Sequence, residues 1–267
     1  MKNVLLLVHD DAGQEARLQC ALDLTRAIDG HLACIDVAIM PRFMDDYISS
    51  GGEALLIADE EAKEARNRER LEKRLAAEDV PWSWADTSGL LSDGVRKAMR
   101  LNDIVVVNAH LDHFPGREMA HVAGELIVGS GKPVLAVPPQ ARRFDVTGHA
   151  MIAWDGSPAA EAALRAAVPL LALAANVTLF EVDDGSIKLP AERAAEYLSR
   201  HGIKPVIRRD SALADVASTV ILAATQSYRA DWLVMGGFGH SRLIEAAFGG
   251  VTRRLFHDAA IPLFLAH

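Results

Sequence analysis

Short apolar runs alternate with amphipathic stretches along the whole chain. Runs such as Val4 to Val8 and Ala150 to Trp154 are apolar at nearly every position, which is typical of strands buried on both faces of a parallel sheet. Between the runs, apolar residues such as Ala21, Leu24 and Ile28 recur at the 3.6-residue period of a helix. The alternation predicts an α/β protein in which helices cover both faces of a doubly wound parallel sheet.

The pattern occurs twice. The expected strand Asp103 to Val107 corresponds to Asp231 to Met235, and Lys132 to Pro138 corresponds to Ile261 to Ala266. The other expected strands after the first of each half are 31–37, 82–85, 177–182 and 205–208. Each half therefore predicts the order β-α-β-α-β-α-β-α-β, with one five-stranded domain at 1–142 and a second at 147–267.

Composition excludes several classes of protein. A net charge of -8 and a pI near 5.7 repel polyanions, and the sequence has no basic stripe, so nucleic acid is not an expected partner. The apolar run that begins at Val4 is shorter than a signal peptide requires, and no run approaches a membrane span. We therefore expect a cytoplasmic protein with no membrane partner. Cys20 and Cys34 match no metal or redox spacing and are expected to be packing residues.

The first half is longer than the second, and the additional residues are expected between Met40 and Ala65. They lead into the highly charged stretch Glu60 to Asp79, in which Glu64 precedes Arg68, and Glu69 precedes Lys73, by one helical turn. This spacing is typical of a solvated surface helix. A helix that docks a protein partner is the alternative.

A glycine-rich segment follows the expected strand that ends at Met235. Gly236 and Gly239 come first, and nine further residues separate Gly239 from Gly249 and Gly250. Glycines directly after a parallel strand permit a tight turn and let phosphates approach the backbone without a Cβ in the way. The second pair precedes a helix, whose first N–H groups and dipole favour an anion. The spacing indicates a phosphate site, with glycines that serve only turns and packing as the alternative.

This arrangement resembles the universal stress protein family, whose nucleotide-binding members carry G-x-x-G, nine residues and G-[S/T] after the fourth strand. The segment Ala153 to Ser157, with Asp155 after the first strand, also resembles the first loop of that family. The resemblance extends over both halves. It implies an adenine nucleotide alpha hydrolase-like fold with strand order 3-2-1-4-5 in each half, ATP or AMP as the ligand, with or without Mg²⁺, and a role in the stress response.

The resemblance also implies which residues form the site in the second half. The residues assigned to the adenine and the ribose are Ala153, Trp154, Asp155, Val182, Met235 and Gly236. Those assigned to the phosphates are Gly239, Gly249, Gly250, Val251 and Thr252. One position departs from the family pattern, because Gly250 replaces the usual Ser or Thr and removes one hydroxyl donor.

The first half departs much further from the family pattern. Asn108, Leu111 and His121 occupy the positions of the three glycines. The acidic residue after the first strand is retained as Asp10, but Asp11 beside it would repel a polyanion. We therefore expect no nucleotide in the first half.

Other chemistries are less consistent with the sequence. Three histidines and an aspartate could ligate a metal ion, but a surface loop is the simpler interpretation of His110, Asp112, His113 and His121. His240 and Ser241 are adjacent on a loop, so they do not form a base and nucleophile pair. No P-loop lysine is present, and we expect at most slow ATP hydrolysis.

Three hypotheses about function follow, in this order. The first is an adenine-nucleotide-binding regulatory protein that reports occupancy to an unidentified protein partner. The second is an interaction protein of the same fold that binds no nucleotide, and the third is a slow nucleotide hydrolase. In each case the fifth strands, 134–137 and 263–265, are expected to pair within the chain as a pseudo-dimer, and a homodimer of the whole chain stays open.

Overall fold

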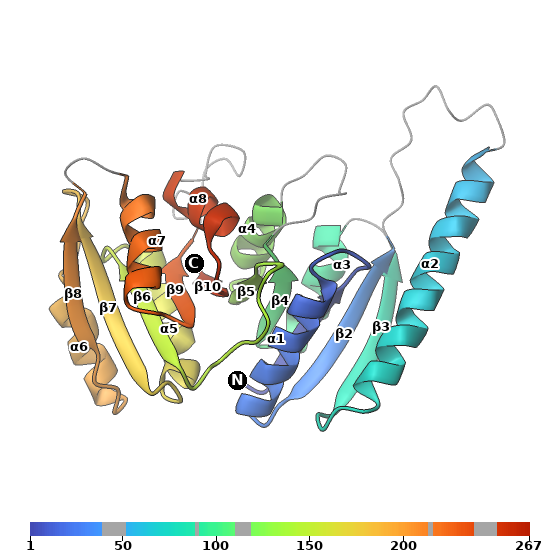
Figure 1. The fold of residues 1–267 in the computed structure, drawn as a ribbon, viewed down its shortest axis with the longest axis horizontal. Helices are drawn as coiled ribbons and strands as arrows, with labels where there is room; N and C mark the ends of the chain where they lie inside the picture. Colours follow the sequence, from blue (N-terminus) through green and yellow to red (C-terminus); the bar gives the residue numbers. More distant parts are fainter. Residues whose placement is uncertain (39–51, 89–90, 110–118, 213–215, 238–249) are drawn as a thin grey trace.

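The computed structural model describes residues 1–38, 52–88, 91–109, 119–212, 216–237 and 250–267. Ten strands form one sheet in the order β3-β2-β1-β4-β5-β10-β9-β6-β7-β8 (Figure 1). Each half contributes five strands, and the order within each half is 3-2-1-4-5. The predicted α/β class and strand order are confirmed.

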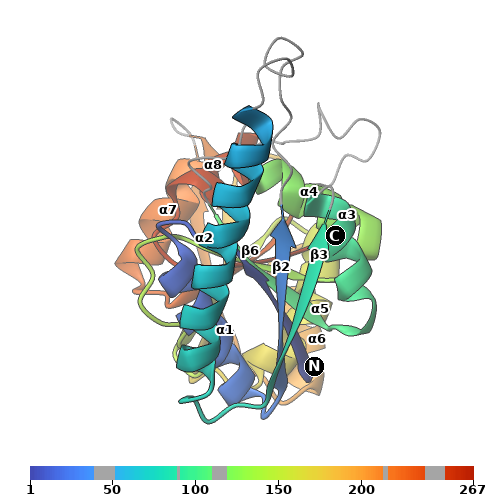
Figure 2. The same ribbon diagram turned by 90° about the vertical axis from the view of Figure 1, so that its right-hand side faces the viewer.

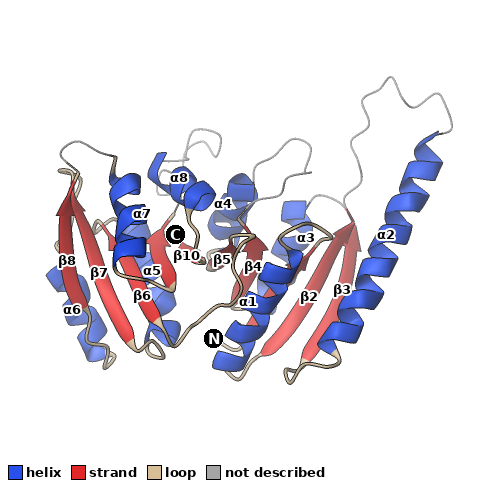
Figure 3. Cartoon of the chain, in the orientation of Figure 1, coloured by secondary structure: helices blue, strands red, loops and turns tan. Residues whose placement is uncertain are grey.

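The elements follow the predicted alternation (Figure 3). The first half contains β1 (Asn3–Val8), α1 (Gln14–Ala27), β2 (His31–Ala38), α2 (Gly52–Leu75), β3 (Trp82–Ser88), α3 (Leu91–Ala98), the 3-10 helix η2 (Met99–Leu101), β4 (Ile104–Asn108), α4 (Met119–Ser130) and β5 (Val134–Val137). The second half contains β6 (His149–Trp154), α5 (Pro158–Leu171), β7 (Asn176–Asp183), α6 (Ala191–Arg200), β8 (Val206–Ser211), α7 (Ala217–Ser227), β9 (Trp232–Gly236), α8 (Gly250–Asp258) and β10 (Leu263–Ala266).

The two halves meet at an antiparallel seam. β5 pairs with β10, with Leu135 opposite Phe264, whereas the neighbouring strands within each half are parallel. The seam gives each fifth strand a partner, so neither is left as an open edge that could recruit another chain. The predicted pairing of the two fifth strands is therefore confirmed.

Helices cover both faces of the sheet, as Figures 1 and 2 show. One hydrophobic core lies under α1, α2, α5 and α6, and the other under α3, α4, α7 and α8. Alternate residues of each strand enter opposite cores, so Ile152 and Trp154 of β6 join the first core while Met151 joins the second. The connection between the halves is also packed, because Phe144 contacts Trp232 edge-on with ring centroids 5.6 Å apart.

The predicted charged helix is α2, which has 24 residues where its counterpart α6 has 10. Leu71 and Leu75 anchor it in the core. Lys73 Nζ donates to Glu69 Oε1 at 2.8 Å, as the spacing predicts, but both side chains are largely exposed, so this pair adds little stability. Figure 1 shows the amino-terminal end of α2 projecting beyond the sheet. That it docks a partner stays an untested alternative.

Two further expectations concern burial. Cys20 and Cys34 are buried, and burial raises the pKa of each thiol to about 12. Both thiols are therefore held in the neutral form as packing groups. Among the residues that the structure describes, no helix combines the length and the apolar character that a membrane crossing requires.

Candidate functional site

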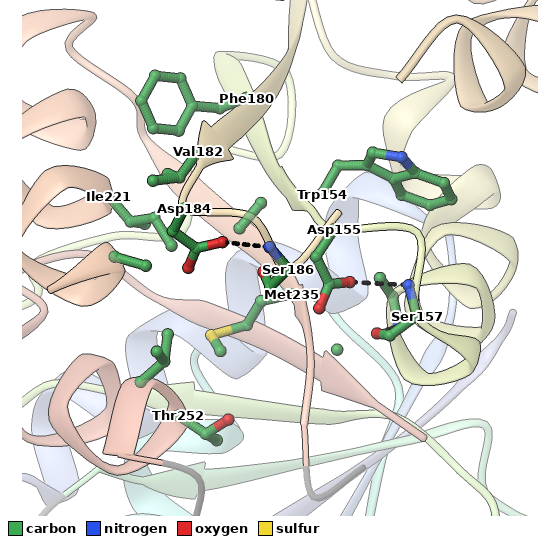
Figure 4. A pocket seen from close by; sticks show the side chains of 15 residues that line it. Trp154, Asp155, Ser157, Phe180, Val182, Asp184, Ser186, Ile221, Met235 and Thr252 are labelled. Carbon is green, nitrogen blue, oxygen red and sulfur yellow. Dashed lines mark hydrogen bonds between the residues drawn. The ribbon is translucent and has the colours of Figure 1, made fainter. Parts of the chain in front are cut away.

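A cavity of about 160 Å³ opens at the carboxyl ends of β6 and β9 (Figure 4). β7 and β8 lie on one side of β6, and β9 and β10 lie on the other, so the strand order reverses at this point. Open α/β sheets bind ligands at such switch points. The residues that line the cavity are Ala153, Trp154, Asp155, Ser157, Ala160, Phe180, Val182, Asp184, Ser186, Ala217, Ile221, Met235, Gly236, Val251 and Thr252.

The loop after β6 supplies a polar edge to the cavity. Asp155 Oδ1 accepts a hydrogen bond from Ser157 N at 2.9 Å, which fixes the direction of the carboxylate. Ser157 also caps α5, because its Oγ accepts from Ala160 N at 3.2 Å. Gly156 between them has φ +70°, and a Cβ there would lie 2.2 Å from Leu189 N. Only glycine fits this turn without strain.

The loop after β7 closes against the loop after β6. Lys188 N donates to Asp155 O at 2.8 Å, and Trp154 Nε1 donates to Leu189 O at 2.8 Å. The indole of Trp154 packs in the core shared with α5, on the face of the sheet opposite Ala153. Its indole therefore supports the β7–α6 loop, and Trp154 also lines the cavity. Its assignment to the adenine and the ribose stays a prediction.

Gly236 ends β9 where the start of α5 approaches it. A Cβ at this position would lie 2.4 Å from Ala160 N, closer than real Cβ atoms come to backbone. Glycine thus lets the strand and the helix touch and keeps the end of β9 open to the cavity.

The opposite side of the cavity is the first turn of α8, where Val251 and Thr252 line it. Gly250 begins this helix, and among the residues that the structure describes no atom would lie within 4 Å of a Cβ there. The unpaired N–H groups of a first turn and the helix dipole favour an anion. The predicted phosphate residues Gly239 and Gly249 lie outside the described residues, and so do His240 and Ser241.

Eight of the predicted site residues line this one cavity: Ala153, Trp154, Asp155, Val182, Met235, Gly236, Val251 and Thr252. Gly250 lies beside it as the first residue of α8. The sequence analysis missed Asp184 and Ser186, although Asp184-Gly185-Ser186 repeats the letters of Asp155-Gly156-Ser157. It also missed the apolar wall of Phe180, Ala217 and Ile221.

Comparison with known proteins assigns the family of the second half. The model of the universal stress protein family matches residues 147–267. These residues belong to the universal stress protein family. No curated protein matched the sequence.

The whole chain has the fold of solved universal stress protein structures. A universal stress protein from Archaeoglobus fulgidus superimposes with a TM-score of 0.75 at 15% identity, covering 99% of this chain and 96% of that one. A Pseudomonas aeruginosa protein of unknown function gives 0.56 at 14% identity, covering 99% and 92%. At these identities the likeness establishes the fold of both halves and nothing finer.

The sheet register corrects one alignment between the two universal stress protein-like halves. The sequence analysis matched Asp10 to Asp155. β1 and β6 have equal lengths and end at Val8 and Trp154, so His9 is the counterpart of Asp155. Asp10 instead forms an exposed ion pair with Arg70 of α2, at 2.8 Å.

Larger side chains occupy the corresponding place in the first half. The same register matches Leu7 to Ala153, Gln14 to Ala160 and Asn108 to Gly236. All three larger residues are buried, and the Gln14 amide exchanges hydrogen bonds with that of Asn67 from α2. Each of the three is larger than its counterpart in the second half, which leaves less room for a ligand at these positions.

Arg17 binds backbone carbonyl groups at the carboxyl end of β1. Its side chain is fully buried; Nε donates to Leu7 O at 2.7 Å, and Nη2 donates to His9 O at 3.0 Å. The same guanidinium pairs with the Asp11 carboxylate at 3.0 Å. Burial lowers the pKa of Arg17, and the negative charge of Asp11 opposes that effect. The second half has Ala163 at the matching position, and there Lys188 N reaches the Asp155 carbonyl that corresponds to His9 O.

The structure does not test whether the histidine-rich segment of the first half binds a metal ion, which the sequence analysis gave as an alternative to a surface loop. His110, Asp112 and His113 lie outside the described residues. Within the ranges that the structure describes, no three His, Cys, Asp or Glu side chains come close enough together to hold a metal ion.

Proposed function

We propose that the second half binds an adenine nucleotide, ATP or AMP, in the cavity between β6 and β9, and that occupancy is a signal to a protein partner in the stress response. The observation that carries the proposal is the position of the cavity at the switch point, with the first turn of α8 on one side. This is where a doubly wound sheet presents both a crevice for a nucleoside and backbone N–H groups for its phosphates.

The two ends of the cavity differ in chemistry. Phe180, Val182 and Ile221 form an apolar wall that suits a planar base. At the other end, Thr252 offers a hydroxyl and the start of α8 offers N–H groups to a phosphate. Asp155 lies between them, and Figure 4 shows its second oxygen turned toward the cavity, where it can accept from a ribose hydroxyl. Mg²⁺ would enter with the phosphates of ATP.

The proposal is one of binding rather than turnover, in a cytoplasmic protein, with one nucleotide per chain. The family assignment favours a binding role. We expect a single site because Leu7, Gln14 and Asn108, which are buried in the first half, are larger than the residues at the matching positions of the cavity. An interaction protein that binds no nucleotide is the alternative, with the long helix α2 as its docking surface.

Calorimetric titration with ATP and AMP, combined with native mass spectrometry, tests the proposal. We expect one nucleotide per chain. Gly250→Asp places a carboxylate at the start of α8, where a Cβ meets no atom of the described residues within 4 Å. It should weaken binding at least about tenfold by repelling the phosphates. Because Asp at a helix start stabilises the helix, lost affinity would not reflect a lost element.

The control is His121→Asp, which places the same charge in the first turn of α4 in the first half and should leave the affinity unchanged. Two nucleotides per chain would contradict the assignment to the second half alone. No binding with ATP and Mg²⁺ would favour the interaction protein.

A further inference from the structure

Two loops of the same sequence face the cavity from neighbouring strands. Asp155-Gly156-Ser157 follows β6, and Asp184-Gly185-Ser186 follows β7. In each loop the Asp Oδ1 accepts from the Ser N at 2.9 Å, and the glycine has a positive φ, of +70° and +81° respectively. Each turn holds its carboxylate in one direction, and Figure 4 shows both carboxylates beside the cavity.

Asp184 belongs to the apolar end of the cavity. Phe180 and Val182 are alternate residues of β7 that enter the core on the α7 side, and Asp184 continues this alternation just past the end of the strand. Ile221 of α7 completes the same wall. A base that packs against these three apolar side chains would have the Asp184 carboxylate at its edge.

A carboxylate at the edge of a base distinguishes one base from another. An ionised carboxylate can only accept hydrogen bonds, and Asp184 Oδ1 already accepts from Ser186 N. Adenine offers an exocyclic 6-amino group as a donor, whereas the 6-oxygen of guanine or hypoxanthine is an acceptor. Resting on the proposed function, we propose that Asp184 sets the base preference of the site by accepting a hydrogen bond from the 6-amino group of adenine.

Asp155 cannot take this role in the same way. It follows β6 at the start of α5, beside Ser157 and Gly236, on the side of the cavity assigned to the sugar. The two aspartates therefore separate two kinds of selectivity, for the sugar by Asp155 and for the base by Asp184. Their matching turns make each a control for the other.

The test compares ATP with purine riboside triphosphate, in which hydrogen replaces the 6-amino group, by calorimetric titration. The wild-type protein should bind ATP about tenfold more tightly or better, the effect of one hydrogen bond to a charged acceptor. Asp184→Ala should bring the two affinities within about twofold of each other. Asp155→Asn should weaken both ligands by the same factor and keep the ratio.

A second variant guards against a general loss of the site. Asp184→Asn retains an oxygen that can accept from Ser186 N, and its amide adds a donor that suits a 6-oxygen. It should therefore lower the preference for ATP over inosine triphosphate. The inference about Asp184 would be overturned if Asp184→Ala left the ratio of the affinities for ATP and purine riboside triphosphate unchanged. It would also be overturned if the wild-type protein bound GTP more tightly than ATP. Neither result would contradict the proposed function. Failure of the wild-type protein to bind any of these nucleotides would overturn the proposed function as well.

Discussion

Replacing Arg17 by Met should destabilise the first half by about 3 to 5 kcal/mol. Met keeps an unbranched apolar stem but is shorter than Arg, and it removes the donors to Leu7 O and His9 O and the charge that faces Asp11. The side chain of Arg17 is 1% exposed and that of Asp11 is 11% exposed, so solvent compensates little for the lost pair. The cost arises mainly from the Asp11 carboxylate, which stays partly buried without its counter-charge.

Urea unfolding, followed by tryptophan fluorescence and circular dichroism, measures the effect. Trp82 and Trp84 report on the first half, while Trp154 and Trp232 report on the second. Because two domains can unfold in separate steps, we expect the transition of the first half to move to lower urea in the Arg17→Met protein. The transition of the second half should move less.

Two further variants test the cause. Lys73→Met removes an exposed pair with Glu69, in which the side chains are 75% and 70% exposed, and should cost less than about 1 kcal/mol. Arg17→Met combined with Asp11→Ser removes both charges and introduces the serine found in the second half, and it should recover part of the loss. A cost below about 1 kcal/mol for Arg17→Met, or a double variant no more stable than the single one, would refute the argument.

Three further results are expected. Gly250→Ser introduces the hydroxyl typical of the family at a position where no described residue lies within 4 Å of the Cβ. Calorimetry should show ATP binding about two- to tenfold tighter, and unchanged affinity would mean that this residue does not reach a phosphate. In the Gly156→Ala protein, alanine must adopt a φ of +70° and bring its Cβ to 2.2 Å from Leu189 N. Urea unfolding should therefore show that the free energy of unfolding falls by at least about 2 kcal/mol. An unchanged free energy would contradict the turn geometry. Burial raises the pKa values of Cys20 and Cys34 to about 12. Both should therefore react with a thiol reagent at pH 8 only after denaturation. Rapid reaction of the native protein would show that the core opens.

The elements and their order could be predicted because apolar runs and helical periodicity occur twice in the same sequence. The position of single residues within that pattern was less secure. Asp10 was matched to Asp155 by chemical identity, whereas the lengths of β1 and β6 show that His9 holds that place. Side-chain alternation along β6 could have shown that Trp154 points away from the face of Ala153, but the family likeness named the whole segment.

The loop after β7 could not be assigned from the sequence for a different reason. Asp184 and Ser186 have no spacing relation to the glycine segment, and they join the site only because β7 lies next to β6 in the sheet. The repeated letters Asp-Gly-Ser were visible in the sequence. Their meaning depends on both loops ending parallel strands at the same edge, which is a property of the folded sheet.

Asn108 stands in the first half where the second half has Gly236, and a glycine on the neighbouring helix side compensates for the difference in size. In the second half Gly236 permits the end of β9 to touch the backbone of Ala160. In the first half the glycine stands on the helix side instead, as Gly13, where a Cβ would lie 3.7 Å from the Cβ of Asn108. A small residue on either side satisfies the contact between helix and strand. Only glycine on the strand also leaves the end of that strand open to a ligand, and in the first half that position is the larger, buried Asn108.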